Sequence, residues 1–152
     1  MNAIAWRVIV PLGLLAIVGC SGSGEKAEGA WGKGEDGLRA MLLAPRAAVS
    51  LGEPIVLQVR VRNQTGEVAP LASAHSLTLR VTRGDKTVGD DLDYVNLAPE
   101  AVKLAPGEER SFPLREYATD GPEAKLCKGP GLYRFQGQLG KLELPPVEVR
   151  VE

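Results

Sequence analysis

The stretch that decides the fold is Ile55-Val56-Leu57-Gln58-Val59-Arg60-Val61-Arg62. Apolar side chains at positions 55, 57, 59 and 61 alternate with polar side chains at 58, 60 and 62. Successive side chains of a strand point to opposite faces, so this period of two predicts a β-strand with one buried and one wet face. We therefore expect a sheet that packs one face against a core.

The same alternation returns twice along the chain. Leucine or valine stands at 77, 79 and 81, and valine stands at 147, 149 and 151 of the C-terminal stretch. Turn sequences that contain glycine or proline lie between these stretches, at 51–54, 63–66, 83–86, 105–108 and 129–131. Short alternating strands with such punctuation predict an antiparallel β-sandwich of about seven strands.

Three segments resemble parts of bacterial immunoglobulin-like domains. Residues 48–54, ahead of the Ile55 strand, resemble the entry to the second strand, and residues 104–112 resemble a mid-domain hairpin. Gly131-Leu132-Tyr133-Arg134-Phe135 is similar to the start of strand F, where the tyrosine hydroxyl would bond back to the backbone. The resemblance covers residues 38–152 and implies an immunoglobulin-like antiparallel β-sandwich. The Cys…Trp…Cys core of antibody domains is absent.

The N-terminus has the three-part layout of an export signal. Arg7 precedes a 12-residue uncharged run from Val8 to Gly19, which is shorter than the roughly 20 residues that span a bilayer. Ile17-Val18-Gly19-Cys20 then resembles the bacterial lipobox. This resemblance implies that residues 1–19 are a signal peptide cut between Gly19 and Cys20, and that Cys20 carries the lipid.

The lipobox resemblance also implies a location and a partner. Acyl chains of the palmitate type on Cys20 would hold the protein on a bacterial membrane, because two or more chains give stable attachment. Ser21, and no aspartate, follows the cysteine. In a host with two membranes, this residue favours the outer one.

Residues 20–37 are expected to form the lipidated cysteine and a flexible linker. The segment is rich in glycine and charge, and Trp31 is its single large apolar side chain. A flexible chain of the 17 residues from 21 to 37 has a root-mean-square reach of roughly 20–25 Å. Residues 38–152 would then be one folded domain.

Composition limits the partners of residues 20–152. These residues hold 17 Lys and Arg against 19 Asp and Glu, a net charge of −2. Nucleic acid requires clustered cations, so no nucleic-acid partner is expected. With Cys20 lipidated, Cys127 cannot form a disulfide with it, and an ordinary apolar core must stabilise the fold.

The sequence contains no strong catalytic or metal-binding pattern. His75 is the only histidine, and no nucleophile motif accompanies it, so a hydrolase that uses His75 is a remote alternative. Neither a metal nor a cofactor is expected. Asp90, Asp91 and Asp93 lack the ligand spacing of a calcium loop, and the question of calcium stays open.

The least regular stretch, residues 117–131, is the candidate binding loop. Long loops in compact domains are usually functional or mobile, and both alternatives stay open here. The candidate residues are Tyr117, Asp120, Lys125, Cys127 and Lys128. The preferred hypothesis is a non-enzymatic, lipid-anchored module that binds a protein or polysaccharide of the envelope. A proteinase inhibitor or another modulator of enzymes is the alternative.

Overall fold

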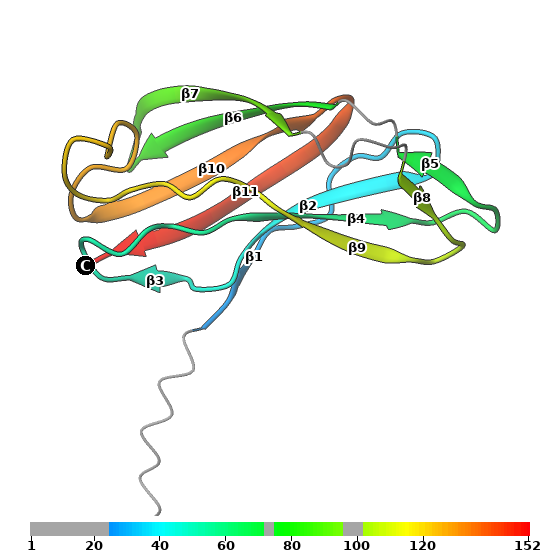
Figure 1. Ribbon diagram of the computed structural model, residues 1–152, viewed down its shortest axis with the longest axis horizontal. Helices are drawn as coiled ribbons and strands as arrows, with labels where there is room; N and C mark the ends of the chain where they lie inside the picture. The colour runs from blue at the N-terminus through cyan, green and yellow to red at the C-terminus, as the bar shows by residue number, and fades with distance from the viewer. Residues whose placement is uncertain (1–24, 72–74, 96–101) are drawn as a thin grey trace, which may run out of the picture.

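The computed structural model describes residues 25–71, 75–95 and 102–152 and shows an all-β fold (Figure 1). The strands of these residues are β1 (Ala27–Glu28), β2 (Leu38–Ala44), β3 (Ala48–Val49), β4 (Gln58–Asn63), β5 (Ala69–Leu71), β6 (His75–Arg83), β7 (Lys86–Val95), β8 (Val102–Leu104), β9 (Glu109–Pro113), β10 (Gly131–Leu139) and β11 (Leu142–Val151).

The strands form two facing layers. One sheet has the order β1-β2-β4-β9, the other has the order β3-β11-β10-β6-β7, and β5 pairs with β8 at one end of the molecule (Figure 1). All pairs are antiparallel except β3 with β11. The orders β2-β4-β9 and β11-β10-β6-β7 match strands A-B-E and G-F-C-C′ of an immunoglobulin-like sandwich. The predicted fold class is confirmed.

The predicted strand number was too low. Eleven strands lie within the described residues, against about seven expected. The additional strands include β1, β3, β5 and β8, which have only two or three residues each. A strand of that length is too short to display a period of two in the sequence.

The alternating stretches supply the core. The inward residues of the deciding stretch, Ile55, Leu57, Val59 and Val61, are fully buried. The apolar positions of β6 and β11 are buried as well, and Tyr133 and Phe135 are the largest fully buried side chains. Burying such side chains is the main favourable contribution to folding.

The predicted tyrosine corner is present at the start of β10. The Tyr133 hydroxyl donates to the carbonyl of Lys128 at 2.7 Å and lies 2.9 Å from that of Gly129. Burial raises the pKa of this hydroxyl above its usual value, and the nearby Arg83 guanidinium opposes the shift. Arg83 also donates to the carbonyls of Lys128 and Pro130. These bonds fix the chain that leads into β10.

A buried asparagine organises the turn after β4. The Asn63 amide nitrogen donates to the carbonyls of Glu67 at 2.7 Å, Leu104 at 3.0 Å and Ala105 at 3.1 Å. Its carbonyl oxygen accepts from the Thr65 backbone N–H at 2.9 Å and from the Thr65 hydroxyl at 2.7 Å. Asn63 therefore ties the predicted 63–66 turn to the strand end at Leu104.

We expect Asn63→Ala to lower the free energy of unfolding by about 2–4 kcal/mol, because it leaves several buried carbonyl groups with fewer donors. Chemical denaturation of the variant measures the change. Gln64→Ala alters the exposed neighbouring side chain and should stay within about 0.5 kcal/mol. Equal effects of the two substitutions would contradict the role assigned to Asn63.

The flexible linker predicted for residues 20–37 is wrong for residues 25–37, which belong to the sandwich. β1 pairs with β2, the Gly29 N–H donates to the Leu42 carbonyl, and the Gly32 N–H donates to the Ala40 carbonyl, both at 2.9 Å. Asp36 and Gly37 have φ of 51° and 76°, as a tight hairpin turn requires. Residues 20–24 lie outside the described residues.

The glycines of this segment permit close approach of backbones. A Cβ on Gly32 would lie 1.9 Å from the Glu143 carbonyl oxygen of β11, and one on Gly34 would lie 2.2 Å from the Leu38 carbonyl oxygen. The Glu143 N–H also donates to the Lys33 carbonyl at 3.3 Å. The segment therefore contacts both β2 and β11, which belong to different sheets. The glycine content that suggests flexibility in the sequence serves packing.

Candidate functional site

The candidate loop 117–131 is packed against the sandwich. The Ile55 N–H donates to the Tyr117 carbonyl, and the Tyr117 N–H donates to the Ile55 carbonyl, both at 2.9 Å. The Tyr117 ring lies 5.2 Å from the Phe135 ring, and the Cys127 side chain is fully buried. Tyr117 and Cys127, two of the five predicted binding residues, are therefore part of the core.

The other three predicted residues lie on the surface. Asp120, Lys125 and Lys128 are exposed, and the Asp120 carboxylate accepts from the Gly121 N–H at 2.7 Å. Lys125 lines a hollow of about 220 Å³ together with Tyr117 and Cys127, whereas Asp120 and Lys128 do not line it. The loop thus brings three of the predicted residues together, two of them with buried side chains.

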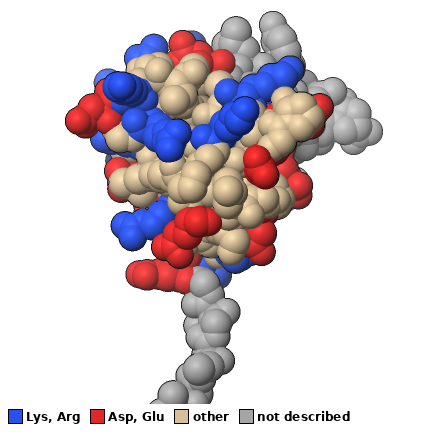
Figure 2. Space-filling view, turned by 90° about the vertical axis from the view of Figure 1, so that its left-hand side faces the viewer, with Lys and Arg blue, Asp and Glu red and all other residues tan. Residues whose placement is uncertain are grey.

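Charges of both signs are interspersed on the end of the sandwich that Figure 2 shows. Within the described ranges, no three His, Cys, Asp or Glu side chains converge as metal ligands. Asp90, Asp91 and Asp93 all lie on strand β7, and Asp90 is paired with Arg80. β6 begins at His75, whose side chain lies outside the described part. Within the described residues, no helix is long and apolar enough to cross a membrane.

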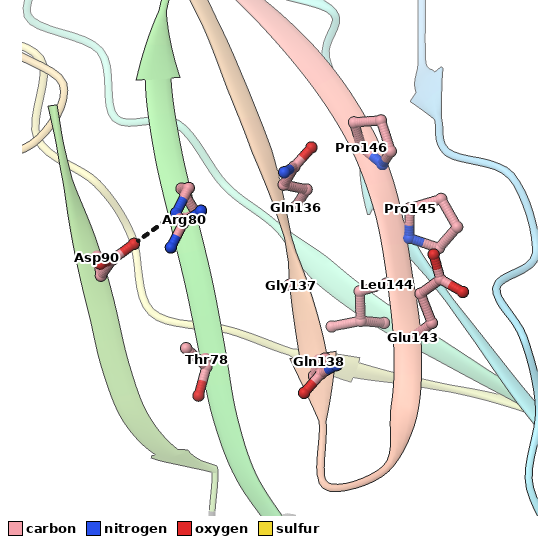
Figure 3. A pocket seen from close by; sticks show the side chains of 10 residues that line it. All are labelled: Thr78, Arg80, Asp90, Gln136, Gly137, Gln138, Glu143, Leu144, Pro145 and Pro146. Atoms are coloured by element: carbon pink, nitrogen blue, oxygen red, sulfur yellow. Dashed lines mark hydrogen bonds and ion pairs between the residues drawn. The ribbon is translucent and has the colours of Figure 1, made fainter. Parts of the chain in front are cut away.

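A groove of about 560 Å³ crosses the outer face of the larger sheet, over β6, β10 and β11. Figure 3 shows Gln136 and Gln138 of β10 along its centre, with the Arg80–Asp90 pair on one side and Glu143, Pro145 and Pro146 on the other. Thr78 also lines it. Sites for small ligands commonly have volumes of about 300–1,000 Å³.

An irregularity in the sheet forms the groove. Phe135 pairs with Val147 and Gly137 pairs with Leu144, so that both Pro145 and Pro146 stand opposite the single residue Gln136. Two residues opposite one define a β-bulge, which bends a strand and re-aims its side chains. Proline lacks an N–H group and is tolerated in a sheet at such a bulge. The bulge therefore places two apolar rings beside the groove.

The approach of β10 to β6 is unusually close at the same level. A Cβ on Gly137 would lie 1.8 Å from the Thr78 carbonyl oxygen of β6. The glycine lets the backbones of β10 and β6 approach at this point. Gly137 therefore sets how closely β10 lies to β6 beside the groove.

Some of the described polar groups that line the groove are hydrogen-bonded within the protein, and others are not. The Arg80 Nε donates to the Asp90 Oδ1 at 3.0 Å, which positions one rim. The Glu143 carboxylate accepts from the Lys33 N–H at 3.3 Å. Within the described residues, the amides of Gln136 and Gln138 form no side-chain hydrogen bond. Each amide offers two donor hydrogens and an acceptor oxygen.

This groove was not predicted from the sequence. The signals were Gly137 inside a strand and Pro145-Pro146 inside the last alternating stretch. Glycine or proline in the interior of a strand often marks a bulge or a close approach of backbones. The outward polar residues alone resemble an ordinary wet face, so only the bulge distinguishes them.

No protein-family model and no curated protein matches the chain. An alkylpurine DNA glycosylase from Pseudomonas fluorescens is similar to 78% of this chain at 14% identity and a TM-score of 0.49. A β-glucosidase from Erythrobacter marinus is similar to 76% at 16% identity and a TM-score of 0.49. A CARDB domain from Pyrococcus furiosus, solved with two metal ions, is similar to 75% at 18% identity and a TM-score of 0.41.

These likenesses differ in how much of the other protein they include. The chain spans 31% of the glycosylase and 15% of the β-glucosidase, but 91% of the CARDB domain. With identities below 20% and TM-scores below 0.5, the fold assignment rests on the strand order of this chain.

Proposed function

We propose that the protein is a lipid-anchored, non-enzymatic binding module of a bacterial envelope, and that the groove over β10 holds its partner. The observation that carries the binding role is the pair of glutamine amides at the centre of the groove. Gln136 and Gln138 face outward, form no side-chain hydrogen bond to the described residues, and lie beside an ordered ion pair. Such convergent polar groups in a hollow are typical of a ligand site.

The anchor rests on the lipobox resemblance at Cys20, and the structure gives it a geometric consequence. The Glu25 carbonyl accepts from the Ala47 N–H at 2.6 Å, so the chain joins the sandwich at residue 25. Five residue steps from Cys20 to Glu25 span at most about 18 Å. A lipid on Cys20 would therefore hold this edge of the domain close to the membrane surface.

The anchor is tested by metabolic labelling with palmitate in the source bacterium. We expect the label in the wild-type chain and its loss in Cys20→Ala, because only Cys20 stands in a lipobox. Cys127→Ala is the matched control, since Cys127 is buried, and it should keep the label. Label that persists in Cys20→Ala would contradict the anchor.

The binding role is tested with a chain that begins at Ser21, which lacks the lipid and keeps every residue that the structure describes. This chain should co-sediment with envelope fragments of the source bacterium. The double variant Gln136→Ala/Gln138→Ala should bind about 10-fold more weakly, while Gln58→Ala on the other sheet binds normally. Equal binding by the Ser21 chain and by both of its variants would exclude the groove as the binding site.

A further inference from the structure

We propose that the groove recognises a neutral polysaccharide of the envelope through vicinal hydroxyl groups; this inference rests on the proposed binding function. The first argument is the kind of polar group on the groove floor. Each glutamine amide carries a donor and an acceptor side by side. Adjacent ring hydroxyls also each donate and accept, so one amide can bond to two neighbouring hydroxyls at once.

The spacing of the two amides fits a chain-like ligand. Gln136 and Gln138 are two residues apart on β10 and share the outward face. Residues two apart in a strand are about 7 Å apart, so the two amides contact different hydroxyl groups along an extended ligand. The groove is open and follows β10, with residues of β6 and β7 along one side and residues of β11 along the other.

The walls complement the two faces of a sugar ring. Pro145 and Pro146 present apolar rings on one side, where the C–H groups of a sugar can pack. Thr78 and the Arg80–Asp90 pair supply hydroxyl, guanidinium and carboxylate groups on the other. Only the Nε of Arg80 is used by Asp90, and a guanidinium has five N–H donors.

The charge of the groove favours a neutral ligand. Arg80 is balanced by Asp90, and Glu143 adds one further negative charge. An anionic polymer would meet this net negative charge without a clustered cation to offset it. A protein partner is the competing class. The centres of protein–protein interfaces are enriched in aromatic side chains, and no aromatic side chain of the described residues lines this groove.

The test uses envelope fragments and the Ser21 chain with two matched treatments. Periodate cleaves the carbon–carbon bond of vicinal diols and should abolish co-sedimentation, whereas digestion of the fragments with proteinase K should leave it unchanged. On untreated fragments, Gln136→Ala/Gln138→Ala should reduce binding about 10-fold and Gln58→Ala should not. The unfolding midpoints of both variants should stay close to that of the wild type, because none of the three side chains is buried.

The outcomes separate this inference from the proposed function. Binding that survives periodate but is lost after proteinase K overturns the polysaccharide and keeps the groove as a protein-binding site. Binding that is sensitive to periodate yet unaffected by the double variant overturns the groove as the sugar site. A chain that binds no untreated fragments overturns both the inference and the binding role.

Discussion

Gly137→Ala is expected to lower the free energy of unfolding by about 3 kcal/mol, because the new methyl group has no room in the sheet. Gly137 pairs with Leu79 of β6 on one side and with Leu144 of β11 on the other. Its Cβ would lie 1.8 Å from the Thr78 carbonyl oxygen, a backbone atom that two strand ladders hold in place. Relief of the clash requires β6 and β10 to move apart, and their movement breaks hydrogen bonds of the central strands.

Thermal unfolding followed by circular dichroism measures this effect. A loss of that size corresponds to a fall in the midpoint of about 10 °C for a domain of this length. Gly66→Ala is the matched control, since nothing lies within 4 Å of its Cβ position. If Gly137→Ala unfolds at the same temperature as Gly66→Ala, the close approach of β6 and β10 described here is incorrect.

Much of the fold follows from local sequence patterns, and the two-residue strands show the limit of such patterns. β6, β10 and β11 have nine or ten residues each, long enough for the alternation of buried and exposed side chains to appear in the sequence. β3 has two residues, and its parallel pairing with β11 depends on where the chain passes after Pro45. That pairing comes from tertiary packing, which no local pattern encodes.

Two of the five residues predicted for the binding loop lie in the core, for a related reason. Residues 117–131 are irregular in sequence, and irregularity suggested an adaptable loop. Tyr117 and Cys127 nevertheless pack in the core, and the Thr119 hydroxyl donates to the Glu53 carbonyl at 2.8 Å. A loop without a period can still be well packed, because its side chains meet partners far away in the sequence.

The groove was overlooked because it is created by register. Gln136 and Gln138 are ordinary outward residues in the alternation of β10. They line a hollow only since Pro145 and Pro146 together oppose Gln136. Sequence shows the prolines, but the pairing of β10 with β11 decides which residues they face.

The N-terminal segment gives the second large expected effect. A chain that begins at Leu38 should lose about 3–5 kcal/mol relative to one that begins at Glu25, because it lacks β1 and the backbone bonds of Gly29, Gly32 and Lys33 to β2 and β11. If residues 25–37 were a flexible linker, the two chains would have equal stability. Chemical denaturation of both chains distinguishes these cases.

A point variant tests the same contact without removing residues. Gly32→Ala should destabilise the sandwich by about 2–3 kcal/mol, since its Cβ would lie 1.9 Å from the Glu143 carbonyl oxygen. In a flexible linker the same change would be neutral or slightly stabilising. Ala30→Ser, at an exposed position of the same segment, should have little effect. Because Glu143 also lines the groove, Gly32→Ala should weaken the proposed binding to envelope fragments as well.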